Sequence, residues 1–124
     1  MRNRDELIWA AGFWDGEGYM GVAHQHWKGK LRKQAHAHLS QVDVRPLRRF
    51  HKAIGFGKVR ARTHSKEWLM KHPNWSQQYR WDVSSFERVQ ALGAVLWKWL
   101  SPPKREQFKK TMKEMKQWYK RKKA

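Results

Sequence analysis

The chain is short and strongly basic: its 124 residues include 28 Lys and Arg against 10 Asp and Glu, a formal net charge of +18. This length suits one compact domain, and we assign residues 1–124 to a single domain. So basic a domain repels itself unless a polyanion is near, which makes nucleic acid the expected partner. The sequence contains no cysteine, so disulfides, thiolate metal sites and cysteine nucleophiles are excluded.

Membranes are not an expected partner. The sequence has no run of about 18 apolar residues and no signal-peptide pattern at its start. We therefore expect a soluble, intracellular protein without a small-molecule substrate, in the cytoplasm or an organelle. The nine tryptophans are interpreted mainly as core and interface residues, with base stacking as the alternative.

The N-terminal residues 1–18 carry a predicted helix. Asp5 is a suitable N-cap, apolar side chains follow at helical spacing, and Gly18 ends the run. Period-two alternation over residues 19–42 then predicts a β-hairpin with its turn at Lys28-Gly29-Lys30. A helix followed by a hairpin is therefore the first half of the expected fold.

The second half of the chain repeats this order. Asp43 is expected to cap a short helix that ends at Gly55. Residues 56–83 alternate as a second hairpin with a polar loop in its middle. Residues 84–123 contain two further helices, separated by Ser101-Pro102-Pro103. The predicted fold class is α+β, with an αββαββα core, an antiparallel sheet and an extra C-terminal helix.

The most informative motif is Ala10-Ala11-Gly12-Phe13-Trp14-Asp15-Gly16-Glu17-Gly18. Gly12 and Gly16 lie four residues apart, so they share a helix face on which two backbones can approach closely. A glycine inside a helix costs roughly 0.5–1 kcal/mol relative to alanine, which favours a compensating close contact over mere fraying. Glu17 would lie at the negative end of the helix dipole, so we expect a cation beside it.

This motif resembles the signature of the LAGLIDADG homing endonucleases, and the element order resembles that family's core fold. The resemblance implies a site-specific endonuclease that hydrolyses phosphodiester bonds in double-stranded DNA and serves intron mobility. One motif copy implies a homodimer on a long near-palindromic site, as isologous symmetry requires. The implied cofactor is Mg²⁺ or Mn²⁺, with Ca²⁺ as a non-catalytic substitute. The alternatives are a non-cutting maturase or transcription regulator of the same fold, and a generic basic RNA-binding protein.

The resemblance also assigns site residues. Glu17 matches the metal-binding acid, with the backbone carbonyl of Gly16 beside it. Gln41, Arg45 and Lys104 match accessory catalytic residues, and the paired prolines leave the register of Lys104 open. The expected dimer-interface residues are Ala11, Gly12, Asp15 and Gly16.

Polar side chains alternate onto one face of the predicted sheet, where they can reach base edges in the major groove. The expected DNA-contacting residues are Gln25, Trp27, Arg32, Gln34, His36, His38, Lys58, Arg60, Arg62, Gln78 and Arg80. An ordinary solvated sheet face is the alternative. Zinc binding by the four histidines at 24, 26, 36 and 38 is not expected, because strand parity places the two pairs on opposite faces.

Overall fold

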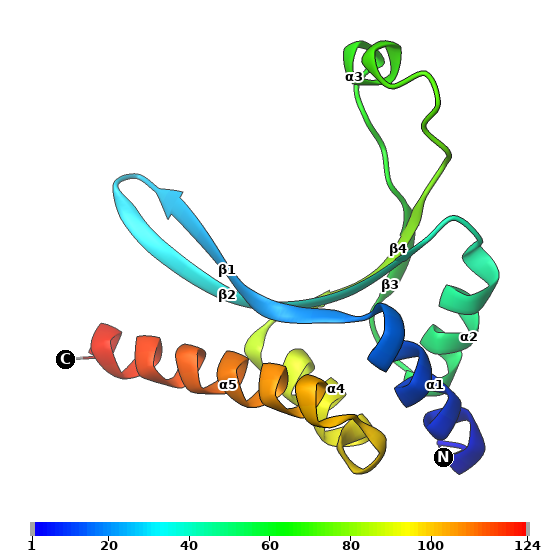
Figure 1. Cartoon of the computed structure of the whole chain (residues 1–124). Coiled ribbons are helices and arrows are strands. Elements are labelled where there is room, and N and C mark those ends of the chain that lie inside the picture. The colour runs from blue at the N-terminus through cyan, green and yellow to red at the C-terminus, as the bar shows by residue number, and fades with distance from the viewer. Residues whose placement is uncertain (1, 124) are drawn as a thin grey trace.

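The structure is a computed structural model that describes residues 2–123, with side chains for residues 2–122. Four strands form one antiparallel sheet in the order β1-β2-β4-β3. Helices α1, α2, α4 and α5 lie against one face of this curved sheet, and its concave face is open (Figure 1). The elements are α1 Arg4–Glu17, β1 Tyr19–Trp27, β2 Lys30–Gln41, α2 Val44–Ile54, β3 Lys58–Ala61, α3 Lys66–Lys71, β4 Tyr79–Ser84, α4 Phe86–Leu96, the 3-10 turn Trp97–Trp99 and α5 Pro102–Lys123. The expected α+β fold is confirmed.

The start of α1 differs from the expectation. Asn3, rather than Asp5, is the N-cap, because its extended backbone lets its side chain accept a 3.1 Å hydrogen bond from the amide of Glu6. Asp5 lies in the first turn, where its charge suits the positive end of the helix dipole. Gly18 ends the helix as expected, and its amide donates to the carbonyl of Trp14. A Cβ at Gly18 would overlap the Trp14 ring, so only glycine fits there.

The two hairpins differ in regularity. Nine consecutive residue pairs join β1 to β2, from Tyr19 with His38 to Trp27 with Lys30. Their turn at Lys28 and Gly29 has positive φ at both residues, as a tight hairpin requires. The second hairpin has only short strands, β3 and β4, and the segment between them contains the helix α3.

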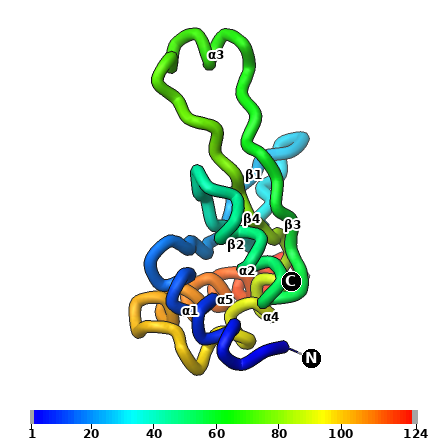
Figure 2. The backbone as a smooth tube through the Cα atoms, turned by 90° about the vertical axis from the view of Figure 1, so that its right-hand side faces the viewer, coloured from blue at the N-terminus to red at the C-terminus, as the bar shows by residue number. Residues whose placement is uncertain are grey.

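Helix α3 was not predicted and lies at the far end of a projection from the sheet (Figure 2). The side chain of Ser65 caps it by accepting a hydrogen bond from the amide of Trp68. The Trp68 ring stacks between those of His64 and His72, with centroid separations of 3.7 Å and 3.9 Å. These aromatic contacts, between residues four apart, order a segment whose polar composition indicated a loop.

The core lies between the sheet and the helices. Trp81 of β4 packs edge-on against Phe50 of α2 and Trp14 of α1, all three buried. Ala35 and Ala37 present only methyl groups on the buried face of β2, which lets the helices approach the sheet. Burying such large aromatic side chains is the main stabilisation available to a chain with this much charge.

The prolines after the 3-10 turn begin a helix as well as ending one. Helix α4 stops at Leu96, four residues before the predicted Leu100, and the chain turns through Trp97–Trp99. Pro102 and Pro103 then occupy the first turn of α5, where no amide hydrogen is needed. Within residues 2–123, no helix has both the length and the apolar character that a membrane span requires.

Candidate functional site

The α1 helix is divided lengthwise into a buried face and an open face. Ala10, Ala11 and Trp14 are buried in the chain's own core. On the other side, Gly12 and Gly16 are exposed, and a Cβ built at either would meet no atom within 4 Å. This open glycine strip leads directly to Glu17, which is also exposed. Ala11 is therefore a core residue rather than the interface residue that we expected.

Ser101 and the first turns of α5 hold the end of α1 in place. The Asp15 carboxylate accepts a hydrogen bond from the amide of Ser101, at 3.0 Å and 3.2 Å to its two oxygens. The Lys104 ammonium donates to the carbonyl oxygen of Gly18. The amide of Met20 donates to Oε1 of Gln107 at 3.1 Å. Lys104, one residue past the prolines, is thus a cation at this helix end, and the expected cation beside Glu17 stays a prediction.

Gln41 and Arg45 lie at the junction between β2 and α2. Gln41 is half-buried at the end of β2, opposite Tyr79 of β4. Arg45 is exposed and binds Asp43 with both Nε and Nη2, the latter at 2.6 Å. This pairing lowers the pKa of Asp43 to about 2. The described contacts of Arg45 are thus local, and its action on a reacting water molecule stays a prediction.

Metal donors at the end of α1 are oxygen atoms. Glu17 provides a carboxylate, and the last carbonyls of a helix, including that of Gly16, lack partners within the helix. Oxygen donors of this kind suit Mg²⁺. Among the residues that the structure describes, no group of three or more His, Asp or Glu side chains can hold a metal ion. Metal binding by Glu17 and the Gly16 carbonyl therefore stays a prediction.

The sheet register places the predicted contact residues on the concave face. Gln25 is opposite Arg32, and Arg60 is opposite Arg80. These outward positions alternate with the buried positions of the core, as along β2, where Ala35, Ala37 and Leu39 are buried. His24 lies on the helix side of the sheet, where its Nε2 is 3.0 Å from Glu114 of α5. The parity prediction is therefore correct for the histidine pairs.

The concave face is less uniformly cationic than the sequence suggested. The pKa of His38 is lowered to about 4 by partial burial and the nearby Arg80 guanidinium, and burial also lowers the pKa of His36. Both imidazoles are therefore neutral near pH 7 and can donate and accept hydrogen bonds. Asp82 also lies on this face and binds Arg60 through two guanidinium nitrogens at 2.9–3.2 Å.

Tyr19 is a concave-face residue that the sequence analysis missed. Its ring centroid lies 5.5 Å and 5.3 Å from those of His36 and His38. The space over Gly21 holds the Tyr19 side chain, because a Cβ at Gly21 would overlap its hydroxyl. The alternation along β1 puts Tyr19 on the same face as Gly21 and Gln25, and this was the only sequence signal for its position. Tyr19 was overlooked because it is the first residue of the strand.

Comparisons with known proteins identify the fold. No protein-family model and no curated protein matches the sequence. The homing endonuclease I-CvuI, solved with an I-CreI target, superposes with a TM-score of 0.70 at 20% identity, over 92% of this chain and 69% of that chain. The homing endonuclease I-TnaI matches with a TM-score of 0.66 at 22% identity, over 91% and 71%. The LAGLIDADG homing endonuclease I-GzeII, solved with a DNA target, gives 0.66 at 18%, over 95% and 38%.

Proposed function

We propose that this chain, which has the fold of the LAGLIDADG homing endonucleases, cuts both strands of a specific duplex DNA site as a metal-dependent homodimer. One observation carries the proposal. The sequence motif places an exposed carboxylate, Glu17, where an open glycine strip ends and where Lys104 approaches the helix end. A binding module alone has no need of a carboxylate that faces a phosphate.

Duplex DNA would lie on the concave sheet face. Arg, Lys, Gln and neutral His side chains project from all four strands of this face, and such groups can bond base edges in the major groove. The likeness to endonucleases that were solved with DNA targets supports the same assignment. The net charge of +18 supplies the general attraction to phosphates.

The dimer would form through the glycine strip of α1. Gly12 and Gly16 leave room for the backbone of a second α1, so two helices can pack in contact. In that arrangement the two Glu17 carboxylates converge, and a bound cation offsets their repulsion. Asp15 is occupied by the amide of Ser101, so its part in the interface is to fix the position of α5.

The active-site roles follow from the positions of the groups. A bound divalent metal would polarise the scissile phosphate and lower the pKa of an attacking water molecule. Glu17 and the Gly16 carbonyl would hold that metal. Lys104, positioned by the Gly18 carbonyl, would attract the phosphate of the DNA to this end of α1. Gln41 and Arg45 would orient water from the β2–α2 junction.

The test is Glu17→Gln, with Glu106→Gln as the matched control on the exposed side of α5. The amide keeps the shape of the side chain but loses the charge that holds the metal. Because a metal supplies several kcal/mol of charge stabilisation, we expect cutting to fall on the order of 10³-fold or more. Binding should stay equal or tighten, because a repulsion between acids and phosphates is removed.

The measurement pairs a cleavage assay in Mg²⁺ with a binding assay in Ca²⁺, both on a duplex selected from a randomised library. The control should cut at the wild-type rate. Wild-type cutting by the Glu17 variant would show that the active site is elsewhere. A wild-type protein that binds the selected duplex but never cuts it would be a non-cutting DNA- or RNA-binding member of the fold.

A further inference from the structure

A basic groove lies beneath the tip of the first hairpin. The hairpin turn forms one wall and the last turns of α5 form the other, with Figure 1 showing the hairpin arched over the end of this helix. The groove has a volume of about 670 Å³. Its lining contains five Lys or Arg side chains, two tryptophans and Leu31, without an Asp or Glu among the described lining residues. We call it the hairpin groove.

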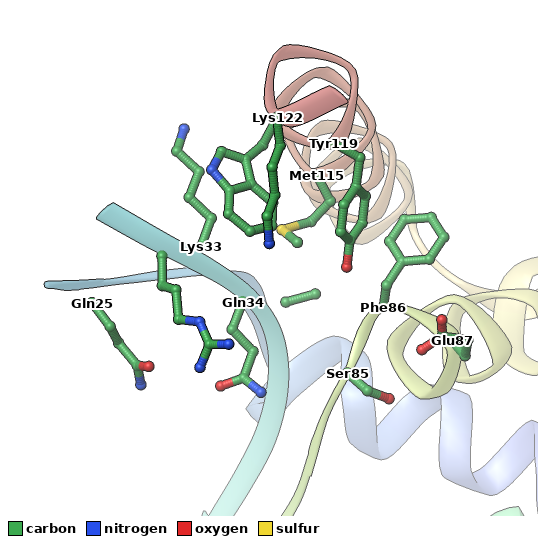
Figure 3. A pocket seen from close by; sticks show the side chains of 12 residues that line it. Gln25, Lys33, Gln34, Ser85, Phe86, Glu87, Met115, Tyr119 and Lys122 are labelled. Atoms are coloured by element: carbon green, nitrogen blue, oxygen red, sulfur yellow. The ribbon is translucent and has the colours of Figure 1, made fainter. Parts of the chain in front are cut away.

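The hairpin groove continues along a free edge of the sheet. β2 pairs with β4 only from His36 to Gln41, so residues 30–35 have no strand on that side. A second hollow of about 330 Å³ runs along this edge and shares Arg32, Trp118 and Lys122 with the groove. Figure 3 shows Tyr119 and Lys122 reaching from α5 toward this hollow, with Gln34 on the opposite side.

The hairpin groove lies at the edge of the sheet and is lined from both of its sides. Leu31 pairs with His26 and Lys33 pairs with His24, so these side chains point to the helix side of the sheet. Lys33 confirms this direction, because its Nζ donates to Glu114 of α5 at 3.2 Å. The alternation along the strands turns Trp27, Lys30 and Arg32 of the same groove to the concave side. A duplex on the concave face would therefore leave the α5 wall of the groove accessible.

The lining combines aromatic rings with cations. Trp27 is 65% exposed, and Lys28 lies 5.8 Å from the centre of its ring. Trp118 is half-buried, with Lys122 at 5.0 Å from its ring centre. Stacking platforms beside cations are typical of grooves that bind single-stranded nucleic acid, since each unpaired base has a free face and each nucleotide a phosphate. Paired bases inside a duplex are already stacked and cannot enter such a groove.

We propose that the hairpin groove binds single-stranded nucleic acid, with unpaired bases against Trp27 and Trp118 and phosphates against Lys30, Arg121 and Lys122. This surface adjoins the concave face at Trp27 and Arg32, and its α5 wall lies outside that face. The polar groups of the adjoining hollow, Gln34 and Tyr119 among them, are placed to meet base edges of the same strand. RNA and DNA strands share this chemistry, and the experiment separates them.

The experiment measures the anisotropy of labelled single strands about eight nucleotides long, one of oligo-uridine RNA and one of oligo-thymidine DNA. The test variant is Arg121→Glu/Lys122→Glu. The matched control is Lys113→Glu/Lys116→Glu, which makes the same charge change on the same helix, at exposed residues outside the groove. We expect the test variant to lose about tenfold or more of its affinity for at least one strand, and the control to lose several times less.

A second variant tests the stacking directly. Trp118→Ala should weaken the same strand by about fivefold or more, while thermal melting verifies that the chain remains folded. Equal losses in the two charge variants would overturn the proposal, since the binding would then be general attraction. Loss of binding to phosphatidylserine vesicles with unchanged strand binding would also overturn it and indicate a membrane contact. Duplex cutting by the charge variants is measured in parallel. The binding of single strands can therefore be interpreted even if the proposed endonuclease activity is not found.

Discussion

The end of α1 gathers the proposed catalytic groups in one place, whereas the concave face spreads its polar side chains over four strands. Gly16 and Glu17 lie at this helix end, where Lys104 binds the Gly18 carbonyl and the amide of Ser101 binds Asp15. The concave face instead offers many separate groups, several of them already paired with one another, such as Arg60 with Asp82. Chemistry at the helix end should therefore be lost in one step, and recognition on the sheet should weaken gradually.

The largest effect that can break this comparison is at Gly12. We expect Gly12→Leu to convert the proposed dimer to a monomer and to abolish cutting of both strands, because the site would lose the second of its two proposed metal-binding carboxylates. A Cβ at Gly12 meets no atom within 4 Å, so the chain's own fold tolerates the leucine. Sedimentation and the cleavage assay measure the two losses.

Ala94→Leu is the matched control for Gly12→Leu, since it adds a similar apolar group at an exposed position of α4. It should stay dimeric and active. A monomeric Gly12→Leu variant that retains wild-type cutting would remove the α1 interface from the account.

A smaller effect is expected at Arg60 on the concave face. Arg60→Ala should relax the preference at one or two base pairs and lower affinity about fivefold to a hundredfold, since a bidentate base contact contributes about 1–3 kcal/mol. It also leaves the Asp82 carboxylate unpaired toward the DNA. The double variant Arg60→Ala/Asp82→Ala should therefore bind DNA more tightly than Arg60→Ala alone, but without the wild-type preference at those base pairs. An equal loss of affinity for every DNA sequence would instead indicate that Arg60 contacts a phosphate.

The smallest effect concerns the pH dependence of stability. The pKa of His38 is about 4 in the folded chain and near its ordinary value of 6.5 when unfolded. Between these values the unfolded chain binds more protons, so the free energy of unfolding should fall as pH falls from 6.5 to 4. His38→Gln should show a smaller fall between about pH 7 and about pH 5 in urea unfolding. Parallel curves for variant and wild type would contradict the neutral, partly buried imidazole.

The periodicity of apolar residues predicted most of the fold, because the residues at the predicted spacing are the ones buried in the core. The alternation of residues 31–39 gave both faces of β2, including the direction of His36 and His38. Helix α3 was missed because it is stabilised by the stacking of Trp68 between two histidines. Such stacking produces no periodic pattern of hydrophobic residues in the sequence. Asp5 was taken as the cap because it is a good capping residue, but Asn3 has the extended backbone that a cap requires.

The candidate site was predictable to the extent that the motif itself contains it. Glu17 and the two glycines were found in one nine-residue stretch, and they share the open end of α1. The role of Ala11 was not predictable, because the side of α1 that packs on the core depends on the aromatic residues of α2 and β4. The contact between Lys104 and Gly18 joins residues 86 positions apart, a separation that the local pattern does not encode.

The most direct test of the central claim uses a mixed dimer. Two differently tagged protomers, one wild type and one Glu17→Gln, are purified together, and each strand of the selected duplex is labelled at its own end. If the two Glu17 carboxylates complete one metal site, the mixed dimer should make no double-strand break and leave at most a nick in one strand, while binding the duplex as tightly as wild type. Cutting of both strands at the wild-type rate would contradict the account, because one carboxylate would then suffice.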